Sequence, residues 1–413
     1  MYAIKYISLN IYPFLLLPCL TLTATVFASD ANSSKTPGSL FSIPRDLTLS
    51  SGNGNAFVKL GGRLQLDYNR YDGVINKNEG ERDSDHFVRR ARLFLEGDIQ
   101  QNWHYKIRFN LNNDATHDLQ NLYVTYKGFG KAAHLTLGKQ QERFGLEKST
   151  SSKYITAIER SMSTNAFAPG TTTGIQLNGV NNYLVYSMGY FNESDDQDNK
   201  LEHAVTGRLT HGLNLDGDNL LHLGAGYTYR KAAYTDVGAR LGVRGGKEKN
   251  ANKVKAEFNE VDKATIGNLE AALVRGDIHI QAEYFHGTYH NALDSNGEHS
   301  DITADGYYIQ AAWFITGETR QYKSAKGAFS KVKPLNKEYG AWELFTRVDQ
   351  LDVNNNQATD IDGAKARSLT AGVNWYINKY LRASANYVNV DVEKEKKGED
   401  DAEAIVARLQ VVF

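Results

Sequence analysis

The sequence predicts an all-β protein, a transmembrane antiparallel β-barrel of about 16 strands with a constriction loop folded inward. Three observations indicate this fold. Apolar and polar residues alternate up to the C-terminal Phe413, as in the closing strand of outer-membrane barrels, which shows one row to lipid and the other to water. The same alternation recurs along the chain, and the connections between its copies are sorted by length.

Alternation with a period of two is clearest from Trp103 to Leu111, where aromatic and aliphatic residues occupy one face and His104, Lys106 and Arg108 the other. Further copies cover residues 58–68, 221–229, 278–286, 309–315, 369–377 and 381–389. All four tryptophans are in phase with the apolar rows. We therefore expect them in the lipid-facing aromatic girdles, which argues against an aromatic sugar track inside the pore.

The connections fall into two classes. Short links near 100–102, 128–132, 180–182, 214–219, 275–277 and 378–379 alternate with longer polar ones near 72–86, 141–173, 192–202, 231–265, 288–305, 352–367 and 391–403. A β-sandwich would alternate too, but it would not sort its connections in this way. Short periplasmic turns and long outer loops place both termini in the periplasm. The long, basic 316–340 connection falls on the short-turn side and does not fit.

Three regions are predicted along the chain. Residues 1–28 form a signal peptide, in which Lys5 precedes an apolar stretch and cleavage follows Ala28. Residues 29–56 are a periplasmic extension rich in Ser, Asn and Gly, and residues 57–413 are the barrel. Cys19 lies in the signal, so the mature chain needs no disulfide. Beyond the signal no apolar run reaches the roughly 18 residues of a membrane helix.

Composition and net charge say little about the solute or about partners. The net charge is −1, so any selectivity must come from where charges are placed. Only Pro169 and Pro334 follow residue 44, which suits long uninterrupted ladders. We predict no nucleic-acid partner, no cofactor and no metal site. Outer-membrane lipid and lipopolysaccharide are the expected surroundings.

The 141–173 loop carries the first candidate site. Lys148, Ser149, Thr150, Ser151, Ser152 and Lys153 place two cations and four hydroxyls within six residues. An oxyanion stripped of water needs several such donors to offset its desolvation. The alternative is an ordinary solvated surface loop.

Three arginines near the start of the second strand form another candidate. In a regular strand Arg90 and Arg92 face the lumen and Arg89 faces out. Arg89 and Arg90 can both point inward only if a β-bulge re-aims one of them. The alternative for Arg89 is snorkelling at the outer rim.

At these residues the chain resembles the phosphate-selective porin O and P family of Gram-negative outer membranes, from about Phe57 to Phe413. The resemblance is carried by the stretches 59–65, 144–153, 316–318, 340–345 and 372–376. It implies a trimeric channel of 16 strands whose constriction binds phosphate. The matching positions are Arg63, Arg89, Arg90, Lys148, Ser151 and Ser152, with Arg240 and Arg244 resembling the family's arginine ladder.

The chain departs from the family pattern in ways that matter for specificity. Gln120 stands where the family carries an acidic residue, and Arg92 and Gln141 replace aromatic neighbours of the constriction. Anion preference survives these changes, whereas specificity for phosphate is put in question. The resemblance also places Lys148 at the narrowest point, so we expect it to contribute more to anion binding than Lys153.

We conclude from the sequence that the chain is a passive anion-selective porin for phosphate or related oxyanions in the outer membrane, assembled as a homotrimer. Two alternatives remain: a general or differently selective anion porin, for polyphosphate or organic anions, and a non-conducting structural or adhesion barrel. An enzyme is not expected, because no pairing of Ser152 with His134 or His203 has supporting spacing.

Overall fold

The computed structural model describes residues 47–51, 55–75, 83–112, 119–182, 184–192, 201–232, 234–240, 243, 253–259, 261–293, 298–353, 365–393 and 401–413. The predicted signal peptide, residues 1–28, and most of the 29–56 extension lie outside these residues.

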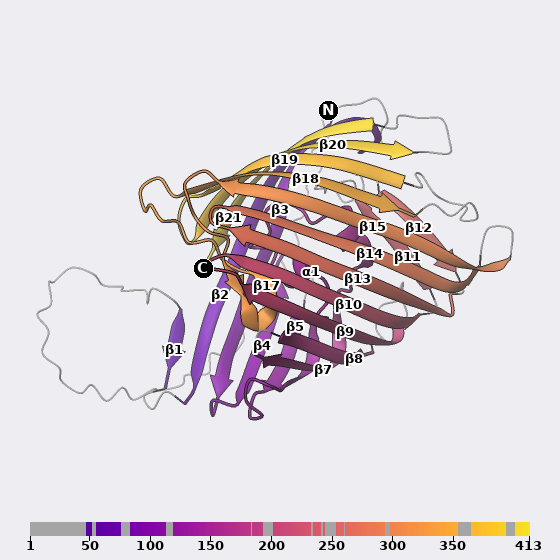
Figure 1. Cartoon of the computed structure of the whole chain (residues 1–413). Helices are drawn as coiled ribbons and strands as arrows, with labels where there is room; N and C mark the ends of the chain where they lie inside the picture. The colour runs from indigo at the N-terminus through magenta and orange to yellow at the C-terminus, as the bar shows by residue number, and fades with distance from the viewer. Residues whose placement is uncertain are drawn as a thin grey trace, which may run out of the picture. The chain divides into compact units, whose positions relative to one another are not determined.

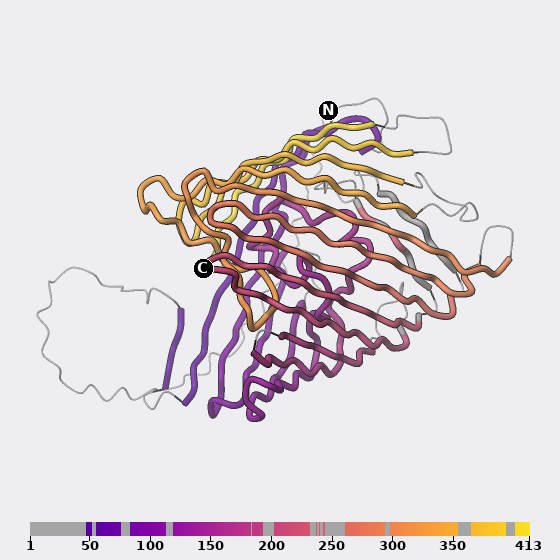
Figure 2. The backbone as a smooth tube through the Cα atoms, viewed as in Figure 1, coloured from indigo at the N-terminus to yellow at the C-terminus, as the bar shows by residue number. Residues whose placement is uncertain are grey.

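Within the described residues, sixteen strands pair antiparallel with their neighbours in a closed ring (Figures 1 and 2). They are β2 (Phe57–Tyr71), β3 (Asp83–Ile99), β4 (Trp103–Asn110), β5 (Leu119–Tyr126), β6 (His134–Gln141), β7 (Thr171–Asn181), β8 (Leu184–Phe191), β9 (Leu201–Asn214), β10 (Leu220–Ala232), β13 (Lys263–Arg275), β14 (Ile278–Leu293), β15 (His299–Phe314), β18 (Ala341–Asp352), β19 (Lys365–Tyr376), β20 (Leu381–Glu393) and β21 (Asp401–Val412). A barrel of this size encloses an aqueous lumen. The predicted fold class is confirmed.

The ring closes where β2 pairs with β21, from Arg63 opposite Val412 to Tyr71 opposite Ala404. The backbones of Gly62 and Phe413 exchange two hydrogen bonds, of 3.0 and 3.2 Å. The Phe413 ring lies across Gly62, where a Cβ atom would approach Cζ of the ring to 2.4 Å. Glycine at position 62 therefore lets the C-terminal aromatic cover the seam.

A short strand continues the ladder beyond the C-terminus. β1 (Thr48–Ser50) pairs antiparallel with the first residues of β2, from Thr48 opposite Lys59 to Ser50 opposite Phe57. Part of the predicted periplasmic extension is thus docked on the barrel.

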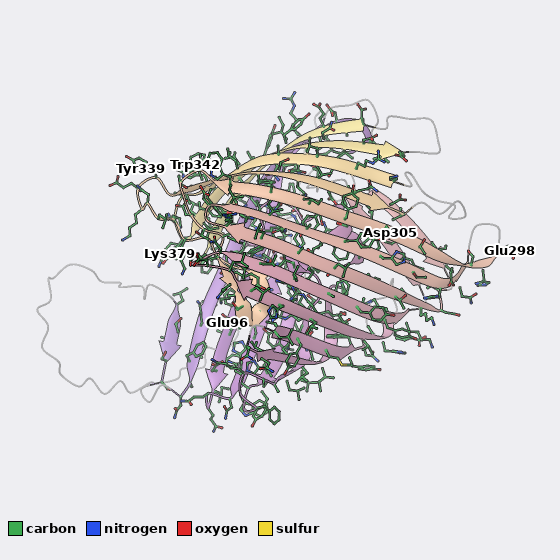
Figure 3. All side chains as sticks on the ribbon, viewed as in Figure 1. Glu96, Glu298, Asp305, Tyr339, Trp342 and Lys379 are labelled. Atoms are coloured by element: carbon green, nitrogen blue, oxygen red, sulfur yellow. The ribbon has the colours of Figure 1, made fainter. Side chains whose placement is uncertain are left out.

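The two ends of the barrel differ as predicted. Figure 3 places Tyr339, Trp342 and Lys379 at the end with the short turns, and Glu298 and Asp305 toward the opposite end. Trp342 and Trp375 stack at the turn end, with ring centroids 5.2 Å apart. In the described part of the chain, no helix is long and apolar enough to cross a membrane.

The two faces of the wall have opposite chemistry. Large apolar side chains such as Leu269, Ile309 and Leu409 are exposed on the outer face. Buried polar and charged side chains such as Arg347, Glu283 and Asn374 belong to the alternate, lumen-facing rows. Since strand side chains alternate between faces, the period-two pattern of the sequence produces this separation directly.

Two connections are more structured than the sequence predicted. The outer 231–265 loop contains a hairpin, β11 (Tyr234–Arg240) and β12 (Lys253–Asn259), and Val237 and Ala239 join a buried apolar cluster with Met162. The periplasmic 315–340 connection contains β16 (Tyr322–Lys323), the 3-10 turn η2 (Ser324–Lys326) and β17 (Ala328–Phe329), and it reaches into the barrel. We call it the periplasmic hairpin segment.

Candidate functional site: a loop across the lumen

The connection between β6 and β7 crosses the lumen. It contains two short helices, α1 (Leu146–Ser149) and α2 (Met162–Phe167). Its backbone contacts side chains of β14, β18, β19, β20, β21 and β2, which form the wall on the far side of the ring from β6 and β7. The predicted inward constriction loop is therefore present.

Two wall carboxylates fix the helices of this loop. Glu283 accepts hydrogen bonds from the backbone N–H groups of Leu146 and Glu147, at 2.7 and 2.8 Å. Gly145, at φ +69°, permits this approach, because a Cβ there would lie 2.7 Å from Glu283 Oε1. Asp349 accepts a 2.5 Å bond from the N–H of Met162. A carboxylate at the free N–H groups of a helix end is a favourable pairing.

Three wall arginines hold carbonyl groups of the loop rather than facing free water. Arg382 donates to the Ile155 and Thr156 oxygens at 2.7 and 2.5 Å. Arg408 donates to Ile158 O at 2.6 Å, and Arg347 donates to a neighbouring carbonyl, Glu159 O, at 3.0 Å. These cations therefore serve as anchors, and counting lumen-facing arginines overstates the free positive charge.

A β-bulge lies at the predicted arginine cluster. Gln65 pairs with Arg90 and Leu66 with Val88, so Arg89 is the extra residue of β3. Arg89 donates from Nε and Nη2 to Glu159 of the loop, at 2.8 and 3.0 Å. Arg90 Nη2 lies 3.9 Å from the same carboxylate. Both arginines point inward, as the bulge alternative required, but both face an acidic residue that the sequence did not suggest.

Arg63 and Ser152 meet at the wall of the constriction. Arg63 Nη1 donates to Ser152 Oγ at 2.7 Å, and the Arg63 side chain makes no ion pair within the described residues. Lys153 lies close enough that the charge of Arg63 acts on it: burial, followed by Arg63, Lys106 and Arg108, lowers its pKa to about 7. Three side chains that can donate hydrogen bonds therefore come together here.

Two lysines near Arg63 lie over the ring of Phe94. The Nζ atoms of Lys106 and Lys153 lie 4.6 and 5.6 Å from the centroid of the Phe94 ring. Lys106 also pairs with Glu96, whereas Lys153 has no such pair in the described part of the chain. Lys106 and Arg108 were not among the predicted site residues, although both lie in the polar row of the Trp103–Leu111 alternation.

Lys148 occupies a different position. Its Nζ donates to Ala168 O at 3.1 Å, and burial lowers its pKa to about 7, with smaller effects from Arg160, Glu142 and Arg230. Ser151 is exposed. The structure thus brings Arg63 and Ser152 together and places Lys148 on another part of the loop.

The remaining predicted residues are placed as follows. Gln120 is half-buried and is the extra residue of a bulge in β5, between Leu119 and Asn121. Arg92 donates to Asn110 Oδ1 at 3.3 Å, and Gln141 donates to Lys148 O at 2.7 Å. Arg240 ends β11, but its side chain and the whole of Arg244 lie outside the described residues.

Comparisons with known proteins agree with this architecture. The family model described as phosphate-selective porin O and P matches residues 58–413. Porin O of Pseudomonas aeruginosa is 36% identical over 393 residues, covering 86% of this chain and 88% of that protein.

Two solved structures illustrate the shared fold. An anion-selective porin from Comamonas acidovorans superposes with a TM-score of 0.54 at 12% identity, covering 87% of this chain and 100% of that one. A trimer form of OmpT of Vibrio cholerae gives 0.52 at 14% identity, covering 87% and 99%.

Proposed function

Because the chain belongs to the phosphate-selective porin O and P family and is an outer-membrane anion channel, we propose that Arg63, Ser152 and Lys153 form its central site for phosphate and related oxyanions. The observation that carries the proposal is the 2.7 Å contact between Arg63 and Ser152 beside a lysine without an acidic partner in the described residues. A hydroxyl and two cations supply the charge-assisted hydrogen bonds that a dehydrated oxyanion needs.

The proposed mechanism is passive. Cationic side chains raise the local concentration of anions, and the loop narrows the path so that the ion exchanges water for side-chain donors. Binding must remain weak enough for the ion to leave. The pairing of Arg89 and Arg90 with Glu159 serves this requirement, because it removes two strong cations from direct contact with the ion. The family points to a channel rather than an enzyme.

Planar bilayer recordings test the proposal. The natural channel should give a reversal potential of anion sign in a chloride gradient, and phosphate should block the chloride current. Arg63→Gln should raise the half-blocking concentration of phosphate about tenfold, as expected for one lost hydrogen bond to a charged group. Arg275→Gln, at an exposed arginine that ends β13, is the matched control and should change neither value. A cation-selective natural channel would overturn the proposal.

The homotrimer is a second part of the proposal, and the height of the wall supports it. β4, β5, β6 and β8 have 8 residues each, whereas β14 and β15 have 16. Eight residues at about 3.3 Å each, tilted by about 40°, give a wall about 20 Å high, below the ~25 Å apolar band of such barrels. The β4–β8 side matches lipid poorly, so we place the subunit contact there.

Quenching by brominated lipid tests this placement. Leu137 on β6 and Leu269 on β13 are 64% and 61% exposed in the single chain, which makes them a matched pair. A fluorophore attached to Leu269→Cys should be quenched by brominated acyl chains, whereas one attached to Leu137→Cys should be shielded by the neighbouring subunit. Equal quenching at both positions would argue against the β4–β8 interface.

A further inference from the structure

A cavity of about 360 Å³ lies between the barrel wall and the periplasmic hairpin segment, and neither Arg63 nor Ser152 is part of its lining. One side of it is the lumen wall formed by β6 to β9, and the other is the η2 turn of the periplasmic hairpin segment. Cavities that hold small organic ligands begin at roughly 300 Å³, whereas a water molecule occupies roughly 30 Å³. The space is therefore much larger than a single phosphate ion requires.

Three cations line the cavity without acidic partners. Lys131, Arg143 and Lys326 form no ion pair within the described residues, whereas the fourth, Arg208, is paired with Glu270 at 2.6 Å. Burial, followed by the charge of Arg143, lowers the pKa of Lys326 to about 8. Lys326 and Arg143 repel each other because both are positively charged. A bound anion would offset this repulsion.

The rest of the lining differs from that of a simple ion site. Val180, Val185 and Ala325 supply apolar surface, and Asn178 and Ser187 supply an amide and a hydroxyl. Both the barrel wall and the η2 turn therefore supply cations as well as apolar surface, and this mixed lining suits a molecule with one phosphate group and a small polar organic part.

The η2 turn is held in place, so the cavity is built into the fold. Arg208 Nη2 donates to Gly327 O at 2.8 Å, immediately after η2. His222 Nδ1 lies 2.6 Å from the hydroxyl of Tyr322, the first residue of β16 in the hairpin segment. Gly327 has φ +55°, and a Cβ there would lie 2.3 Å from Thr210 Oγ1. The turn thus seats closely against β9.

We propose that this cavity is a second anion site, which binds small organic phosphate monoesters such as sugar phosphates through Lys131, Arg143 and Lys326. The inference rests on the proposed function as an anion channel. It adds organic phosphate monoesters to the inorganic oxyanions that we propose for the central site.

Block of the chloride current by glucose 6-phosphate tests the inference in the purified natural oligomer. Lys326→Gln and Arg143→Gln should each raise its half-blocking concentration about tenfold. The half-blocking concentration of inorganic phosphate should stay within about twofold, because the central site is unchanged. Lys333→Gln, at an exposed lysine of the same hairpin segment outside the cavity, should leave both unchanged. Glucose itself should not block.

The possible outcomes separate the two proposals. If both variants weaken block by glucose 6-phosphate and by inorganic phosphate equally, the cavity is only part of the common path and the inference is overturned. If they weaken block by diphosphate but not by glucose 6-phosphate, the assigned ligand class is wrong. If inorganic phosphate fails to block the natural channel while glucose 6-phosphate blocks it in a Lys326-dependent way, the central-site proposal fails and the cavity stands. Retention of the folded oligomer on unheated gels excludes misfolding of the variants.

Discussion

Arg89 donates two hydrogen bonds to the Glu159 carboxylate, of 2.8 and 3.0 Å. This pair connects the bulge of β3 to the middle of the constriction loop. Arg408 donates to the same carboxylate at 2.8 Å. An arginine that the sequence suggested as an anion ligand thus serves as a loop anchor instead. The negative charge of Glu159 therefore partly offsets the positive charge of these arginines, and so weakens their attraction for a passing anion.

Removing that negative charge should strengthen anion binding. Burial alone would raise the pKa of Glu159, but Arg89, Arg90 and Arg408 hold it well below its usual range, so the residue stays ionised in mildly acidic solution. Glu159→Gln keeps an acceptor for the arginines and should lower the half-blocking concentration of phosphate about fivefold, which corresponds to about 1 kcal/mol of reduced charge repulsion. Bilayer titrations would measure it, with the exposed Glu338→Gln as control. Weaker block by phosphate would contradict the assignment.

The two lysines of the loop should differ, in the opposite order to the one that the resemblance suggested. Lys153 lies beside Arg63 and over the Phe94 ring, whereas Lys148 Nζ donates a hydrogen bond to Ala168 O. Lys153→Ala should therefore weaken phosphate block more than Lys148→Ala, by about 1–3 kcal/mol for the loss of a charged donor. Half-blocking concentrations for the two variants would decide the order. A larger effect of Lys148→Ala would restore the expectation from the family.

Strand positions could be predicted from the sequence, because alternation is a local property that a barrel imposes on every strand. Even the bulge at Arg89 was foreseen as the condition for two inward arginines. The anchoring of the loop was not predicted, since Leu146 and Glu283 are 137 residues apart and nothing in either segment indicates the other. Length and positive charge set the 316–340 connection apart in the sequence, but nothing in it indicates that it folds into the barrel.

Anion selectivity should fall as the pH rises through neutrality. Lys148 and Lys153 both have a pKa lowered to about 7, chiefly by burial. Such lysines are mostly charged at pH 6 and mostly neutral at pH 8, so the pore loses positive charge over this range. Reversal potentials in a chloride gradient should shift toward zero between pH 6 and 8, and Lys153→Arg should reduce the shift because arginine stays charged. A selectivity independent of pH would show that neither lysine titrates there.

Discrimination between phosphate and sulfate should be weak in the natural channel and should depend on Gln120. This residue is the bulged position of β5, next to Asn121, which pairs with Arg108. Phosphate near neutral pH still carries a hydroxyl that can donate a hydrogen bond to an aspartate, whereas sulfate carries none. A carboxylate at this position would therefore favour phosphate and repel sulfate. The uncharged amide of Gln120 can accept from phosphate or rotate to donate to sulfate.

We therefore expect both anions to block the natural chloride current at similar concentrations. Gln120→Asp should raise the preference for phosphate over sulfate and at the same time lower the affinity for both, because the added negative charge opposes every anion. Gln350→Asp, on β18, is a control that makes the same change at a side chain bonded to Arg367 rather than to the loop. If the natural channel already prefers phosphate strongly and Gln120→Asp leaves the ratio unchanged, Gln120 only fills the bulge and the specificity arises elsewhere in the constriction.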